Sequence, residues 1–258
     1  MTPSATTLIV VGDITMEHAR QLADDAFGSW SGAAIALPSL VDRPASTMRT
    51  IHVVGKADAP QSEIRVGHVG VPRLHPEYFS IVVMNAILGG LFSSRINLNL
   101  REAHAYTYGA FSSFDWRRGA GPFAVSTAVR SDVTDAAVRE IMIEIDRMRS
   151  AEVSDAELSL ATSYLDGVFP IRFETTTAIA NALSSHVAFG LPNDYFDRYR
   201  ENIRAVTADQ VLEVARAHVR PEELQIVIVG DPATVREPLE RLTLGAVQTY
   251  DAEGVPTT

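Results

Sequence analysis

The sequence predicts an α+β fold in which an antiparallel sheet is covered on one face by helices. Segments that read as strands cluster in the first half of the chain, and segments that read as helices dominate the second half. Apolar and polar positions alternate along residues 62–71, which is typical of a half-buried strand. The chain has 258 residues, of which 46% are hydrophobic, so it can bury the core of one large domain or two small ones.

Residues 50–130 are expected to contain four strands and two helices. The expected strands are 50–56, 62–71, 106–115 and 121–130, with the turn WRRGAG between the last two. A helix is expected at 75–88, with Pro76 in its first turn. The Gly89-Gly90 pair ends this helix, because each glycine costs a helix about 1 kcal/mol. The Ser93-Ser94 pair then offers a cap for a second helix.

The second half is expected to form five helices in succession, followed by a strand and a last helix. The five helices are expected at 132–149, 157–168, 175–189, 194–203 and after Thr207. The strand is expected at 224–229 and the last helix at 234–242. Capping boxes are expected at Ser154/Glu157 and at Thr207/Gln210. Pro170 is expected to stop the second of these helices and Gly190 the third.

One short motif occurs twice, about one domain length apart. The run IVIVGD at 226–231 repeats residues 9–13 almost letter for letter, and each copy precedes a helix that starts near a capping-type residue. A chance match between two common strand endings is the alternative. The repeat predicts that residues 1–30 are the closing strand and helix of a preceding half-domain absent from this chain. A linker at 31–49, a half-domain at 50–242 and a frayed polar tail at 243–258 would follow.

Composition argues against several classes of partner. The net charge is −10, and no basic cluster interleaved with aromatic residues occurs, so neither nucleic acid nor an anionic membrane is expected as a partner. No uninterrupted apolar run reaches the roughly 20 residues of a membrane helix, and the N-terminus lacks the pattern of a signal peptide. The absence of cysteine excludes disulfides and thiolate metal sites.

The segment 88–109, LGGLFSSRINLNLREAHAYTYG, combines a glycine break, a polar helix and an Arg/Tyr pair. Within its helix the residues expected to face the core are Ile96, Leu98, Leu100 and Ala103, and those expected to point elsewhere are Arg95, Asn97, Asn99 and Arg101. Arg101 and Tyr108 are therefore expected on either side of a corner between a helix and a strand.

This segment resembles the C-terminal, non-zinc half-domain of the insulinase/pitrilysin-type zinc peptidases, which include the mitochondrial-processing-peptidase-like proteins. The runs ELSLATSYLDGVFPIRFET, GLPNDYFDRY and LQIVIVGD extend the resemblance over nearly the whole chain. It implies the two-layer sandwich of that family. It also implies that Arg101 and Tyr108 reach across a closed chamber toward a peptide substrate and the developing oxyanion, with His104 and Tyr106 able to line the same cavity.

The resemblance also implies that zinc is held elsewhere. Residues 81–85, IVVMN, stand where the catalytic half-domain has H-x-x-E-H, and no such motif occurs in the chain in either direction. Two histidines four apart are needed to hold Zn²⁺ from one helical face, with the glutamate as base. His75 with Glu77 is interpreted as a helix cap with solvent contacts. No metal or other cofactor is therefore expected in this chain, and Zn²⁺ is expected in a partner domain.

Three functions remain open. The chain is expected to be the non-catalytic half of a two-part zinc endopeptidase whose H-x-x-E-H half is another subunit or a missing N-terminal domain. Alternatively it is a scaffold member of the family, with Arg101 paired to a carboxylate such as Glu102 or Asp115 and Tyr108 merely packed. The third possibility is an unrelated binding domain of similar fold. Because bacterial relatives are often exported, the periplasm is favoured over the cytoplasm, although a signal would lie upstream of Met1.

Overall fold

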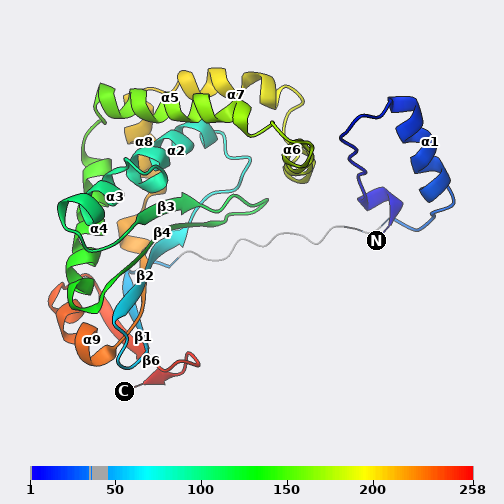
Figure 1. The fold of residues 1–258 in the computed structure, drawn as a ribbon. Helices are drawn as coiled ribbons and strands as arrows, with labels where there is room; N and C mark the ends of the chain where they lie inside the picture. Colours follow the sequence, from blue (N-terminus) through cyan, green and yellow to red (C-terminus); the bar gives the residue numbers. More distant parts are fainter. Residues whose placement is uncertain (1, 35, 37–45, 258) are drawn as a thin grey trace.

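A computed structural model describes residues 2–34, 36 and 46–257, and its core is a seven-stranded sheet in the order β3-β4-β2-β5-β1-β6-β7 (Figure 1). The strands are β1 Thr50–Gly55, β2 Gln61–Val69, β3 Ala110–Phe114, β4 Pro122–Arg130, β5 Gln225–Gly230, β6 Ala246–Tyr250 and β7 Pro256–Thr257. The longer helices are α1 Met16–Phe27, α2 Tyr78–Asn85, α4 Thr134–Ser150, α5 Asp155–Ile171, α6 Thr176–Phe189, α7 Tyr195–Arg204, α8 Ala208–His218 and α9 Pro232–Arg241. Shorter helical turns are η1 Pro3–Ala5, η2 Ala86–Gly90, α3 Arg95–Asn97, η3 Leu98–Ala103, η4 Ser131–Val133 and η5 Pro221–Glu223.

One face of the sheet is buried and the other is open. β2 pairs antiparallel with both β4 and β5, and Ile64 lies opposite Thr127 on one side and Ile228 on the other. All three of these side chains are buried. Helices that include α2, α4 and α9 lie on this face of the sheet (Figure 1), which confirms the predicted α+β fold with helices on one face.

The pairing at β1 is parallel on both sides, which the sequence reasoning did not predict. β1 lies between β5 and β6 and is parallel to each. Parallel neighbours need a long crossover connection, and most of the helical segments lie in the chain between β1 and β5. The sheet is therefore mixed, with antiparallel pairs from β3 to β5.

The expectation of a frayed tail at 243–258 is wrong. Residues Ala246–Tyr250 form β6 along β1, and Pro256–Thr257 return as β7. Thr249 is only 8% exposed. The reason is that β1 would otherwise be an edge strand with unpaired backbone groups, and Val247, Thr249 and Tyr250 suit a strand.

The helix signals were mostly correct, with two exceptions. Both capping boxes form, at Ser154/Glu157 and at Thr207/Gln210, and Gly190 ends α6 with φ +65°. Pro170 was expected to stop α5 at residue 168, but the helix continues to Ile171 and the proline lies in its last turn. The last helix was expected to begin at 234, but α9 begins at Pro232 and is capped by Asp231.

The N-terminal segment forms its helix but not its strand. Thr15 caps α1 by accepting a hydrogen bond from the His18 N–H, as expected. The predicted strand over 8–13 pairs with no strand in the described ranges, and Leu8 and Val10 are 55% and 49% exposed. A strand needs a neighbour for its backbone hydrogen bonds, and no described strand pairs with this segment. Much of the expected linker 31–49 lies outside the described residues.

One continuous stretch is long and apolar enough to cross a membrane by length and mean hydropathy. It runs from Tyr78 to Ala103, and 56% of its most apolar window is buried inside the fold. Leu91 is extended and breaks the stretch into two helical parts. Ile81, Leu88 and Ile96 are completely buried, as expected for the core segment of a folded domain.

An ion pair fastens α3 to the start of α5. Arg95 Nε and Nη2 donate to the two carboxylate oxygens of Glu157 at 2.6 and 3.0 Å. Glu157 also accepts from the Ser154 N–H in the capping box. Chiefly because of the hydrogen bonds from Arg95, the pKa of Glu157 is lowered to about 2.

We expect Glu157→Gln to lower the free energy of unfolding by about 1–2 kcal/mol at pH 7, allowing for solvent screening. The folded pKa lies below the unfolded value of about 4.3, so this stabilisation is complete above pH ~4.5 and is lost as the pH falls toward 2. The difference between wild type and variant should therefore shrink with acid. Urea unfolding from pH 7 to pH 3 measures it, and a pH-independent difference would contradict the assignment. Glu213→Gln, at an exposed position of α8, is the control.

Candidate functional site

The corner between η3 and β3 depends on a buried amide. Asn97 is completely buried, its Nδ2 donates to the Phe92 carbonyl oxygen at 2.6 Å, and its Oδ1 accepts from the Ala110 N–H at 3.0 Å. The side chain thus ties the loop before α3 to the first residue of β3. The expectation that Asn97 points away from the core is wrong, because its amide replaces the backbone partners that both ends of the corner lack.

Only half of the residues that were expected to face the core from α3 and η3 do so. Ile96 and Leu100 are completely buried, but Leu98 is 44% exposed and Ala103 is exposed. η3 is a π-helical turn, so its side chains do not follow the 3.6-residue period on which the expectation was based. Ser94 occupies the N-cap position of α3, but its hydroxyl makes no capping hydrogen bond.

Arg101 projects from η3 over an aromatic ring. Its guanidinium carbon lies 4.3 Å from the centre of the Phe92 ring, a cation–π arrangement. Its Nη1 lies 3.4 Å from Glu102 Oε1, which is one of the ion pairs that the scaffold interpretation expected. The same Nη1 is buried and makes no hydrogen bond within the described ranges. This donor therefore lacks a well-formed hydrogen bond, and a ligand could reach it only after the side chain shifts.

Tyr108 lies in the loop before β3 and is 95% exposed. It does not pack against the domain, which contradicts the scaffold interpretation on this point. Tyr108 and Arg101 line the same hollow of about 430 Å³. Its other lining residues are Gln61, Glu102, Ala105, Tyr106, Thr107, Ala128 and Arg130. The structure thus brings Arg101, Tyr106 and Tyr108 together at one concave surface.

His104 does not line the hollow to which Arg101, Tyr106 and Tyr108 contribute. Its ring stacks on Tyr106 with centroids 4.9 Å apart, and its Nε2 lies 3.8 Å from Glu140 Oε2 on α4. Tyr106 therefore separates His104 from the surface where Arg101 and Tyr108 meet.

Ala105 adopts a left-handed backbone conformation, with φ +52°. This conformation is natural for glycine and costs other residues roughly 1–2 kcal/mol. The corner thus needs a positive φ at position 105, where glycine would be the less strained residue.

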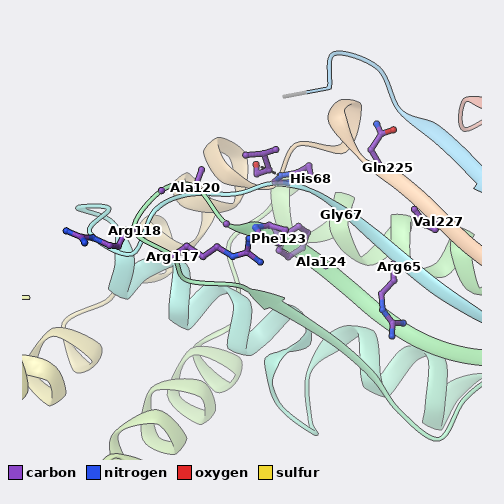
Figure 2. Close-up of a pocket in the computed structure, with 14 residues that line it drawn as sticks. Arg65, Gly67, His68, Arg117, Arg118, Ala120, Phe123, Ala124, Gln225 and Val227 are labelled. Atoms are coloured by element: carbon purple, nitrogen blue, oxygen red, sulfur yellow. Dashed lines mark hydrogen bonds between the residues drawn. The ribbon is translucent and has the colours of Figure 1, made fainter. Parts of the chain in front are cut away.

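A larger hollow of about 800 Å³ lies on the open face of the sheet and was not anticipated (Figure 2). Arg65, Arg117 and Arg118 are among its lining residues. Arg65 pairs with Glu63 at 3.2 Å, and Arg117 pairs with Asp115. Arg118 makes no ion pair with any residue that the structure describes, and Figure 2 shows it extending away from the sheet. The lining comes from three strands and a turn, so no local motif announces it.

His68 borders this second hollow but is a structural residue. Its Nδ1 donates to the Val69 carbonyl oxygen at 2.8 Å, and its Nε2 accepts from the Arg220 N–H at 3.1 Å. Burial lowers the pKa of His68, which favours the neutral ring that this pattern requires. Both ring nitrogens are occupied, so His68 is not available as a base.

Residues 81–85, which stand where the catalytic half-domain has its zinc motif, offer no zinc site. Ile81, Val83 and Met84 in α2 are completely buried and carry no metal-binding donor suited to Zn²⁺. Asn85 is fully used: its Nδ2 donates to the Ser112 carbonyl oxygen, and its Oδ1 accepts from the Ser112 hydroxyl. Residues 81–85 therefore do not fit the catalytic zinc of the family.

Three side chains of the kinds that bind metals lie together where the segment before α2 meets the end of α8. His75, Glu77 and His218 place donor atoms within 4.8 Å of one another. Glu77 Oε2 lies 2.7 Å from His218 Nε2 and 3.9 Å from His75 Nδ1. The interpretation of His75 with Glu77 as a cap and solvent contact missed His218, which stands 141 residues after Glu77 and carries no sequence signal of proximity.

We expect Ala105→Gly to raise the free energy of unfolding by about 0.5–1 kcal/mol, because relief of the positive φ outweighs the added freedom of the unfolded chain. Ala151 is the matched control, since it is exposed and has φ −145°. Ala151→Gly should be neutral or destabilising. Urea unfolding of the two variants measures the difference, and equal destabilisation by both would refute the claim of strain at Ala105.

The chain matches the family model described as the peptidase M16 inactive domain over residues 1–165. An uncharacterized zinc protease of Streptomyces coelicolor is 26% identical over 179 residues, which cover 67% of this chain and 39% of that protein. The beta subunit of the mitochondrial-processing peptidase of Saccharomyces cerevisiae is 21% identical over 187 residues, which cover 68% of this chain and 40% of that protein. The chain thus spans well under two thirds of the length of these relatives.

A crystal structure of a peptidase M16 inactive domain from Pseudomonas fluorescens has the same fold. It superposes with a TM-score of 0.76 at 22% identity and covers 85% of this chain and 52% of that one. The resemblance seen in the residues around Arg101 and Tyr108 is therefore confirmed at the level of sequence family and fold. This chain belongs to the family of peptidase M16 inactive domains, within a family of zinc-protease-like proteins.

Proposed function

We propose that this chain is the non-catalytic half of a two-part zinc endopeptidase and supplies Arg101 and Tyr108 to a composite active site. The observation that carries the proposal is that both side chains line one hollow at the corner between η3 and β3. A zinc-bearing H-x-x-E-H half, in a separate subunit or in another part of a longer polypeptide, would cover this surface. The peptide substrate would lie between the two halves.

The two side chains have the chemistry that this role requires. A guanidinium and a phenol both donate hydrogen bonds, and donors aimed at a developing oxyanion stabilise the transition state of peptide hydrolysis. Arg101 Nη1 lies 3.4 Å from Glu102 Oε1 but makes no hydrogen bond among the described residues, and the Phe92 ring packs against its guanidinium. Tyr108 is 95% exposed, as expected for an aromatic residue that meets a partner or a substrate.

The N-terminal segment supports the existence of a second half. Residues 9–13 share their sequence pattern with β5, the strand that lies between β1 and β2 in this domain. In the N-terminal copy Leu8 and Val10 are instead about half exposed, and α1 has no buried residue. We propose that residues 1–30 are the closing strand and helix of a preceding half-domain, where these apolar side chains would be buried.

The direct experiment mixes this chain with a candidate H-x-x-E-H partner protein from the same genome and follows cleavage of a generic unfolded peptide. The mixture should cleave the peptide, and this chain alone should not. Arg101→Ala should lower kcat/KM on the order of 100-fold, the typical cost of losing one oxyanion donor. Tyr108→Phe should lower it in the same direction, because only the hydroxyl is removed.

Matched controls are available elsewhere on the surface. Arg241→Ala removes an exposed arginine of α9, and Tyr164→Phe alters a half-exposed tyrosine of α5. Both should leave the rate unchanged, and circular dichroism should show that all four variants are folded. If the wild-type mixture is silent, or if Arg101→Ala and Tyr108→Phe behave like the controls, the chain is a scaffold and the proposal fails.

A further inference from the structure

We propose that His75, Glu77 and His218 form a binding site for a divalent first-row transition metal such as Zn²⁺. The site would join the segment before α2 to the C-terminal end of α8, which packs against α2. It lies outside residues 81–85 and does not depend on the proposed peptidase function. The expectation that this chain holds no metal was based on the missing H-x-x-E-H motif and did not consider this cluster.

The spacing of the donor atoms is close to what a metal ion requires. Ligands about 2.0–2.2 Å from a tetrahedral Zn²⁺ are separated by roughly 3.3–3.5 Å. In the structure Glu77 Oε2 lies 2.7 Å from His218 Nε2 and 3.9 Å from His75 Nδ1. The first distance must widen by about 0.7 Å and the second must shorten by about 0.5 Å to reach the tetrahedral separation. The donor atoms of His75 and His218, which lie within 4.8 Å of each other, must also approach, and side-chain rotations can supply these shifts.

The kind of ligand favours a transition metal over magnesium or calcium. Two imidazoles and one carboxylate suit Zn²⁺, Fe²⁺, Co²⁺ and Ni²⁺, whereas Mg²⁺ and Ca²⁺ prefer oxygen ligands alone. Three protein ligands leave room for water at the remaining positions. The Glu77 side chain is 44% exposed, so the site opens to solvent and a metal can enter.

The two histidines are already positioned by the fold. Their side chains are 22% and 12% exposed, and their rings meet edge to face with centroids 4.7 Å apart. The Glu77 N–H donates a long hydrogen bond of 3.3 Å to His75 Nδ1, which a metal at that atom would replace. Burial, and then the neighbouring His218, lower the pKa of His75, so its ring is neutral and able to act as a ligand at pH 7.5.

A simple hydrogen-bonded group is the competing explanation. Glu77 and His218 already make a short contact, and the carboxylate could serve only to orient the imidazole. That explanation accounts for the contact of Glu77 with His218 but leaves His75 with only the long hydrogen bond from the Glu77 N–H, although one of its ring nitrogens lies within 4.8 Å of both other donor atoms. Binding measurements separate the two explanations.

The test uses the whole chain without an affinity tag, stripped of metal with a chelator and titrated with Zn²⁺ by calorimetry at pH 7.5. One equivalent should bind. Glu77→Gln should weaken binding at least about tenfold, because an amide is a poorer ligand than a carboxylate. His218→Ala should weaken it further, and His18→Ala, which removes an exposed histidine of α1, should bind like wild type. Zn²⁺ at about 100 times its Kd should raise the Tm by about 5 °C.

Co²⁺ provides an independent readout, since its visible absorption strengthens and shifts when the aqua ion enters a protein site of lower coordination number. This absorption should appear with wild type and be lost with His218→Ala. If His218→Ala does not fold, Glu77→Gln decides the matter, because a glutamine oxygen can still accept from His218 and preserve the local packing. Failure to bind one equivalent, or equal binding by wild type and Glu77→Gln, would overturn the proposal. Neither result bears on the peptidase function, which is measured by cleavage.

Discussion

The constraint on which the fold depends is the register of β2, the strand that joins the two parts of the sheet. β2 is antiparallel to β4 on one side and to β5 on the other, and its buried residues face buried residues of both neighbours. A shift of one residue would turn Ile64 and Val66 to the open face and would bring Arg65 under the helices. Because only one face is covered, this register determines which side chains form the core and which remain available for binding.

The corner that carries the candidate site depends on a second, smaller constraint. Asn97 satisfies a carbonyl before α3 and an N–H at the start of β3, and the left-handed Ala105 reverses the chain between them. Arg101 and Tyr108 are placed by these features and not by contact with each other. The spacing of the Arg/Tyr pair is therefore a property of the turn, and a change in the turn would separate the two side chains.

The sequence predicted most elements because local signals were strong and agreed with one another. Capping boxes, the glycine after α6 and the alternation along β2 all produced the expected structure. The failures concern interactions between segments distant in sequence. The C-terminal segment forms β6 because it pairs with the backbone of β1, which would otherwise lie at the edge of the sheet. Asn97 is buried because its amide bonds the Phe92 carbonyl oxygen and the Ala110 N–H. The contact between His218 and Glu77 also joins residues far apart in the chain, and no spacing pattern in the sequence could predict it.

The exposure of Tyr108 has a physical consequence for the proposed peptidase role. A hydrogen-bond donor stabilises a developing oxyanion strongly only where water is excluded, since in water the same charge is already solvated. In this chain the hollow is open and Tyr108 is 95% exposed, so neither donor could contribute much to catalysis by itself. Closure by a second half-domain would remove the water and strengthen both interactions. An active site divided between two halves would then switch on only when the halves meet around a substrate.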